Sequence, residues 1–298
     1  MNSLFTAQIF AVLSALAFST GSLFSRYGLR TSTPLTSTLI LGLVTLGIYG
    51  PIALAASPLS EYELRGLLIL AAAGASSPGL ARTLLHMSIR RVGLARSVTI
   101  INVAPLVTVV LAVAALGERP SPGVYLGTFV LVTGVMLLTE EQRTASKSDG
   151  SGKTLWYYFL YALLAGLALG VAMVIRKFGI AIVPSLSTGL SMAAIGAILV
   201  LFLWHPFLPR EDRFKFSRQG VGCFLVSALF TSSAHLFFFA ALQRGPVTMV
   251  APLSSIVPLF TLGYSWLLLR EVERLSFRLA AGAFLICAGA ALISMSRG

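Results

Sequence analysis

Long apolar stretches alternate with short polar segments along the whole chain. Each stretch is near the roughly 20 residues that a helix needs to cross a hydrocarbon core of about 30 Å. Strand-like alternation of period two is absent, so a membrane barrel is not favoured and the stretches are predicted to be helices. The ten predicted spans are Leu4–Ser25, Pro34–Ala56, Leu64–Ile89, Leu94–Leu116, Pro122–Thr139, Thr154–Ile175, Pro184–Trp204, Gln219–Leu242, Pro246–Leu269 and Phe277–Ser294.

Composition strengthens this interpretation. The chain is 56% hydrophobic and 11% charged, whereas a soluble domain carries about 25% charged residues to cover its surface. The predicted fold class is therefore an all-α integral membrane protein with ten transmembrane helices, whose main partner is the lipid bilayer. The net charge is +12, but the basic residues lie in short segments between apolar runs, a pattern typical of membrane topology and not of nucleic-acid binding.

The two halves of the chain repeat the same residues at nearly constant spacing. Pro105 and Pro258 are 153 residues apart, as are Glu118 and Glu271. Such regularity indicates an internal duplication. Further pairs lie 155 and 150 residues apart, and they are Gly127 with Gly282, Gly134 with Gly289, Arg26 with Arg176, and Pro34 with Pro184.

The duplication predicts the domain organisation. A first five-helix repeat is expected over 1–139, a polar linker over 140–153 and a second five-helix repeat over 154–298. Because five is odd, the second repeat enters the membrane from the opposite side. The two repeats are therefore expected to be inverted, with a binding site between them.

Lys and Arg residues predict the orientation. Six of the 22 fall on the side that holds both termini, and the other 16 fall on the opposite side. The six are Arg65, Arg119, Arg176, Lys177, Arg244 and Arg297. Since the basic side faces the cytoplasm, both termini are expected on the non-cytoplasmic side.

The stretch from Ala104 to Leu138 contains APL, then GERPSPGVYLGTFVLVTGVMLL, and Val257 to Ile293 repeats it as VPL with REVERLSFRLAAGAFLICAGAALI. These stretches resemble the EamA-type repeat of the drug/metabolite transporter superfamily. The second turn, Leu269-Arg270-Glu271-Val272, departs from the pattern, because Arg270 and Val272 stand where Gly and Arg are expected around the Glu. The resemblance covers nearly the whole chain.

The resemblance implies a secondary transporter in the inner membrane of a bacterial-type cell, exporting a small-molecule substrate. The branch that the chain most resembles is the YddG-type exporters, which implies amino acids, including aromatic ones. Drugs, nucleobases or other metabolites remain alternatives, as does a non-transporting membrane protein. The oligomeric state is left open.

Enzyme chemistry finds little support. The sequence has no HExxH motif, no GxxxxGK loop and no pair of acids inside a predicted span. Neither Cys223 nor Cys287 has metal-ligand spacing. No catalytic residue, cofactor or metal is therefore expected.

Three ionisable residues fall inside predicted spans: Arg82, His86 and His235. Such groups are costly in lipid and usually face an interior cavity. Arg82 and His86 are four residues apart and share a helix face, and His235 is the repeat mate of Arg82 at 153 residues. The alternative is that Arg82 reaches water at the end of its helix.

Four more residues complete the predicted substrate site, which is expected between the first, third, fourth, sixth, eighth and ninth spans. Phe239 could line an apolar pocket or face lipid. The other three precede Pro105 or Pro258, where a proline frees a backbone carbonyl that either a ligand or a local side chain can use; they are Asn102, Ser254 and Ser255. Pro78 and Pro252 are predicted to add kinks.

Overall fold

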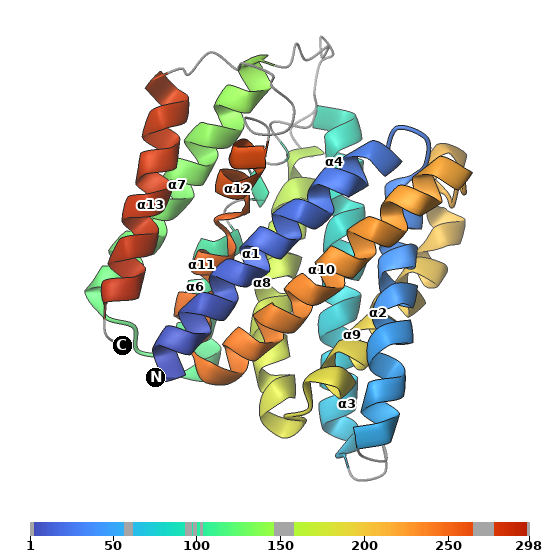
Figure 1. Ribbon diagram of the computed structural model, residues 1–298, viewed down its shortest axis with the longest axis horizontal. Coiled ribbons are helices and arrows are strands. Elements are labelled where there is room, and N and C mark those ends of the chain that lie inside the picture. Colours follow the sequence, from blue (N-terminus) through green and yellow to red (C-terminus); the bar gives the residue numbers. More distant parts are fainter. Residues whose placement is uncertain are drawn as a thin grey trace.

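The computed structural model describes residues 3–56, 62–92, 97, 100–101, 104–145, 158–264 and 277–296. Every regular element among them is helical (Figure 1). The first half contains α1 (Ser3–Gly28), α2 (Pro34–Ala56), α3 (Leu64–Gly74), the irregular turn η2 (Ala75–Leu80), α4 (Ala81–Val92), α6 (Ala104–Leu116) and α7 (Pro122–Ala145). The second half contains α8 (Tyr158–Ile182), α9 (Leu186–Trp204), the short turns η3 (His205–Phe207) and η4 (Arg210–Asp212), α10 (Arg218–Arg244), α11 (Val247–Ser254), α12 (Val257–Tyr264) and α13 (Phe277–Met295).

The number of spans agrees with the sequence. Within the described part of the chain, seven helical stretches are long and apolar enough to cross a membrane, and three shorter apolar helices bring the number to ten. Two spans are composite, because α3, η2 and α4 follow one another as the third, and α11 and α12 make the ninth. The chain is an all-α, ten-helix membrane protein, as predicted.

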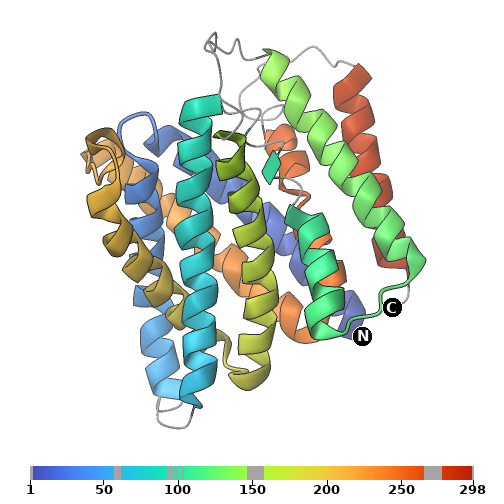
Figure 2. The ribbon, with the colours of Figure 1, turned by 180° about the vertical axis from the view of Figure 1, so that it is seen from behind.

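The two halves are inverted relative to each other. Equivalent helices run in opposite directions, as α1 and α8 do, and likewise α7 and α13 (Figures 1 and 2). The packing partners exchange in the same way: α1 packs on α10, while α8 packs on α3 and α4. The pairs α7 with α13 and α2 with α9 each join a helix to its own repeat mate. A pseudo-twofold axis in the membrane plane relates two halves arranged in this way. The predicted inverted repeat is therefore confirmed.

The contact between α7 and α13 is the clearest trace of the duplication. A Cβ built on Gly134 would lie 2.8 Å from the carbonyl oxygen of Gly282, and one built on Gly127 would lie 2.9 Å from that of Gly289. Each glycine therefore meets the repeat mate of the other. Without side chains at these positions the two backbones approach closely, as small residues allow in membrane helix pairs.

Two spans are broken where the sequence has proline. Ser77, in η2, adopts an extended conformation (φ −149°, ψ 120°) directly before Pro78, whose ring clashes with the preceding helical turn and whose nitrogen cannot donate. In the ninth span α11 ends at Ser254 and α12 begins at Val257. Pro258 lies in the first turn of α12 and has no N–H for the Ser254 carbonyl. The third span therefore has the irregular segment expected at Pro78, whereas Pro252 lies within α11 and precedes the second break.

Two helices, α7 and α8, run well beyond the ends that the apolar pattern predicted. α7 continues past Thr139 to Ala145 and so includes residues 140–145 of the predicted linker, while residues 146–157 lie outside the described ones. α8 continues past Ile175 to Ile182, because the apolar run 178–183 extends the helix until Pro184, which disfavours a helical residue before it. Arg176 and Lys177 consequently lie inside a helix and not in a loop.

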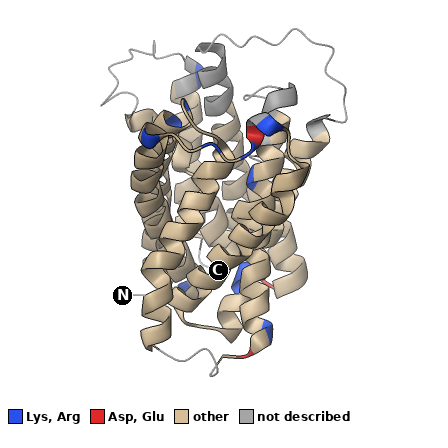
Figure 3. Cartoon of the chain, turned by 90° about the vertical axis from the view of Figure 1, so that its right-hand side faces the viewer, with Lys and Arg blue, Asp and Glu red and all other residues tan. Residues whose placement is uncertain are grey.

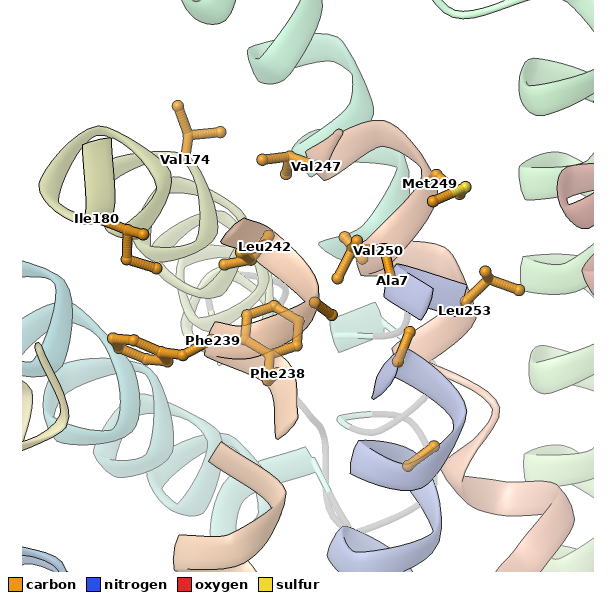
Figure 4. Close-up of a cluster of buried hydrophobic side chains, with 14 of the residues drawn as sticks. Ala7, Val174, Ile180, Phe238, Phe239, Leu242, Val247, Met249, Val250 and Leu253 are labelled. Carbon is orange, nitrogen blue, oxygen red and sulfur yellow. The ribbon is translucent and has the colours of Figure 1, made fainter. Parts of the chain in front are cut away.

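The largest buried cluster joins both repeats. It includes Ala7 of α1 and Val174 of α8, together with Phe239, Leu242 and other residues around the end of α10 (Figure 4). Small residues dominate its α1 side, where Ala7, like Ala11 beyond it, is fully buried. Close packing of this kind holds membrane helices together where lipid gives no hydrophobic drive.

Candidate functional site

A partly open hollow lies between the repeats. The first repeat contributes residues of α2 and η2, and the second contributes residues of α8, α9 and α10. Its lining consists of Leu41, Gly42, Thr45, Pro78, Arg176, Leu190, Ala193, Ala194, Ala197, His235 and Phe239. We refer to this hollow as the central pocket.

Arg176 is the charged residue of the central pocket. Its side chain is only 6% exposed, and one terminal guanidinium nitrogen donates to the backbone carbonyl oxygen of Ser77 at 3.0 Å. The guanidinium carbon lies 5.5 Å from the centre of the Phe238 ring and 5.1 Å from that of Phe239. These cation–π contacts and the carbonyl together hold the guanidinium in place. The carbonyl is free to accept because η2 departs from helical geometry at Ser77.

His235 and Phe239 lie one helical turn apart on α10, and both line the central pocket. The His235 ring contacts the Phe18 ring of α1 edge-on, with 5.5 Å between the two ring centres. Thr45 faces the pocket from α2, and its hydroxyl shares a 2.6 Å hydrogen bond with that of Ser232. The pocket thus combines donors with an aromatic wall and small residues.

Two charged side chains fasten the helices near the end that holds both termini. Glu118 accepts hydrogen bonds from the backbone N–H groups of Val247 (2.7 Å) and Thr248 (2.9 Å), at the start of α11. Gly117, with φ +67°, provides the left-handed residue that turns the chain into Glu118. Lys177 donates to the carbonyl oxygens of Leu242 and Gly245 (2.9 Å for Gly245), at the end of α10. An anion at a helix start and a cation at a helix end both complement the helix dipole.

Glu118 lies in the turn between α6 and α7. Its carboxylate caps a helix that belongs to the other repeat, 129 residues further along the chain. Its repeat mate Glu271 lies outside the described residues.

Arg82 is not among the residues that line the central pocket. It lines a second hollow with Thr38 and Asp212, among others, and its guanidinium makes a long 3.4 Å contact with the Thr38 hydroxyl. Arg82 and its repeat mate His235 thus border different hollows.

The other predicted site residues either lie elsewhere in the fold or fall outside the described part of the structure. Ser254 and Ser255 lie at the break between α11 and α12, and their hydroxyls donate to the carbonyl oxygens of Val250 and Ala251, which is the local use of serine near a broken helix. His86 belongs to α4, but the placement of its side chain lies outside the described part of the structure. Asn102 is also outside the described residues.

The walls of the central pocket overlap those expected from the sequence. The third, sixth and eighth spans, which were expected around the substrate site, line this pocket together with the second and seventh spans. The first, fourth and ninth spans were also expected there, and none of their described residues belongs to the lining. Arg176 was not among the site residues expected from the sequence, because two adjacent basic residues after Ile175 indicate a loop. The apolar run 178–183 was the signal that could have placed it inside the helix.

Comparison with known proteins supports the fold and the duplication. Twenty-seven chains of solved structure match this one. One of them, described only as “Crystal structure of protein”, superposes with a TM-score of 0.76 at 16% sequence identity. The match covers 98% of this chain and 96% of the other chain. At that identity the likeness shows the fold alone. A search of curated proteins found no match.

A family model gives the identity. The model of the EamA-like transporter family matches the chain twice, over residues 5–140 and 156–295. These two matches cover most of the chain, one in each half. The protein is therefore a membrane transporter that belongs to the EamA-like transporter family.

Proposed function

We propose that the chain is a secondary exporter of small amphiphilic metabolites, in the first place amino acids, including aromatic ones. The observation that carries this proposal is the central pocket, which both repeats line and which joins the cationic Arg176 and the imidazole of His235 to the ring of Phe239. A carboxylate and an apolar side chain on one small molecule would match these two kinds of wall.

We further propose that the units 1–139 and 154–298 rock around the pocket in alternating access, with 140–153 as the connection between them. The breaks at Ser77 and between Ser254 and Val257 support this, because interrupted helices at a repeat interface are typical of transporters that work in this way. The bonds of Glu118 to α11 would hold the terminal side closed in the conformation described here.

The orientation that we propose has both termini on the non-cytoplasmic side of a bacterial-type inner membrane. Basic side chains support it, since more of the Lys and Arg lie toward the end opposite N and C (Figure 3). Arg26 in the last turn of α1 is one of these. A reporter that fluoresces only in the cytoplasm, fused after Gly298, should stay dark, and a bright fusion would reverse the orientation.

Counterflow in proteoliposomes tests the transport proposal. Vesicles loaded with unlabelled phenylalanine should accumulate labelled phenylalanine without ATP, and protein-free vesicles should not. A panel with uracil and a cationic dye separates the alternatives. Exchange of uracil or dye in place of phenylalanine would assign another substrate class, and lipid turnover without exchange would point away from transport.

A further inference from the structure

The guanidinium of Arg176 is buried with its hydrogen bonding incomplete. Its Nε atom has no hydrogen-bond partner in the described part of the chain, while a terminal nitrogen donates to Ser77. Arginine stays charged inside proteins, and a buried charge without a partner is strongly unfavourable. The two phenylalanine rings offset part of this cost through their faces, but they do not accept the Nε–H. The Nε–H of this fixed cation is therefore enclosed by its neighbours and has no acceptor among the described residues.

His235 adds a second donor to the same pocket. Neither ring nitrogen has a hydrogen-bond partner among the described residues, and the ring is held by its edge-on contact with Phe18. An imidazole carries at least one N–H in either protonation state. The Thr45 hydroxyl, by contrast, is already bonded to Ser232.

Among the residues that the structure describes, the lining of the central pocket contains no Asp or Glu side chain. The carbonyl oxygen of Ser77, which could attract a ligand cation, already accepts from Arg176. The described lining therefore offers donors and positive charge to a ligand, and no carboxylate of that lining is available to an ammonium group. A ligand that carries both charges would have only its anionic end matched by these side chains.

We propose that Arg176 and His235 bind the carboxylate of the substrate, that its apolar body packs on Phe239 and the small residues of α9, and that its amino group is not recognised. The class of ligand is thus aromatic and other amphiphilic monocarboxylates, with or without an α-amino group. This inference rests on the proposed transport function and narrows its substrate. A guanidinium also binds phosphate esters well, so a phosphate ester is included in the test as the competing class.

The test compares ligands that share a phenyl ring, using the unmodified full-length protein. Phenylalanine and 3-phenylpropanoate both carry the carboxylate, whereas phenylalaninamide and phenethylamine lack it. We expect the two acids to raise the thermal stability of the purified protein and to compete in counterflow at similar concentrations, because a ligand stabilises the state that binds it. The amide and the amine should bind roughly tenfold or more weakly, as expected for the loss of hydrogen bonds to a charged group.

Two arginine variants test whether Arg176 is the residue that binds the carboxylate. Arg176→Gln should weaken the binding of both acids roughly tenfold or more and should reduce their advantage over the amide. Arg244→Gln is the matched control, since its guanidinium also lies over a phenylalanine ring (Phe10, 5.1 Å) and also donates to a backbone carbonyl, that of Ala240. Arg244 does not line the central pocket, so this variant should keep wild-type affinity. Size-exclusion profiles establish whether each variant is folded.

Several results would overturn the inference. If Arg176→Gln does not fold, the ligand comparison with the unmodified protein still tests the inference. Binding of the amide or the amine as tightly as the acids would rule out carboxylate recognition. Binding of phenylalanine far above 3-phenylpropanoate would show that the amino group is recognised after all. Preferential binding of phenyl phosphate would assign the site to phosphate esters. Absence of exchange for every compound would instead refute the transport function on which the inference rests.

Discussion

Arg26 and Arg176 occupy equivalent positions in the two repeats, 150 residues apart, yet their surroundings differ completely. Arg26 is exposed in the last turn of α1, two residues before the helix ends at Gly28. Arg176 is buried, and α8 continues beyond it to Ile182. One arginine lies at a helix end, where basic residues bear on orientation, and the other lies inside the protein at a pocket.

The two arginines differ because the helices next to them differ between the repeats. Pro78 breaks the third span, and the extended Ser77 beside it presents the carbonyl that Arg176 uses. The equivalent stretch of the second repeat, 153 residues later, lies within the continuous helix α10, where Thr231 replaces the proline. The duplication thus copies the scaffold, while the polar site forms where the two copies differ.

The copies agree best at the α7–α13 contact, and the largest effect is expected there. Gly134→Leu and Gly289→Leu should each lower the stability by about 3 kcal/mol, since overpacking forces the helices apart. A Cβ on Gly134 would lie 2.7 Å from the backbone nitrogen of Ile286, and one on Gly289 would lie 2.6 Å from that of Leu131. Thermal unfolding in detergent measures both losses.

The control for the glycine variants is Gly47→Leu, because nothing lies within 4 Å of a Cβ there. It should leave the melting temperature nearly unchanged. Unequal losses at Gly134 and Gly289 would mean that the two copies are not equivalent even at this contact.

The next effect concerns a bond that joins one repeat to the other. Glu118→Ala should lower the stability by about 2 kcal/mol, because two backbone N–H groups lose a charged acceptor. Faster hydrogen exchange at the amides of Val247 and Thr248 should accompany the loss. Arg119→Ala, next to it and exposed, is the control. Unchanged exchange at both amides would show that the first repeat does not hold α11 in this way.

Most of the scaffold could be predicted from the sequence, because lipid imposes span length and backbone pairing on every helix. Gly127, Gly134, Gly282 and Gly289, whose spacing indicated the duplication, all lie in the α7–α13 contact, which the sequence did not predict. Proline at position 78 likewise indicated the broken span.

The site was harder to predict, since its polar contacts join distant parts of the chain. His235 and Phe239 were selected from the sequence and do border the central pocket. Arg176 was not, because a basic residue near the end of an apolar run looks the same whether it points to water or inward. Arg176 points inward to the Ser77 carbonyl, and Ser77 is 99 residues from Arg176 in the sequence.

A smaller effect should follow when the third span is made to resemble α10. Pro78→Ala restores an N–H and removes the ring that clashes with the previous turn. The Ser77 carbonyl should then return toward helical pairing, and Arg176 should lose its acceptor. We expect the apparent affinity in counterflow to fall about fivefold, in keeping with one hydrogen bond of about 1 kcal/mol. Pro51→Ala, at an exposed position inside α2, makes the same exchange away from the pocket. Equal affinities for the two variants would separate the broken span from the site.

The smallest effect is expected at Arg26, the exposed member of the arginine pair. Arg26→Gln should change stability by less than about 0.5 kcal/mol, as is usual for surface substitutions, and should leave the apparent affinity for carboxylates at the wild-type value. Its guanidinium does not line the central pocket, whereas that of Arg176 does. Measured beside Arg176→Gln in the same proteoliposomes, this variant asks whether the two repeats contribute unequally to the site. If Arg26→Gln lowered the affinity as much as Arg176→Gln, both arginines would act on the substrate. The exposed position of Arg26 would then belong to only one step of the transport cycle, and the contrast between the repeats would describe a conformation and not a division of roles.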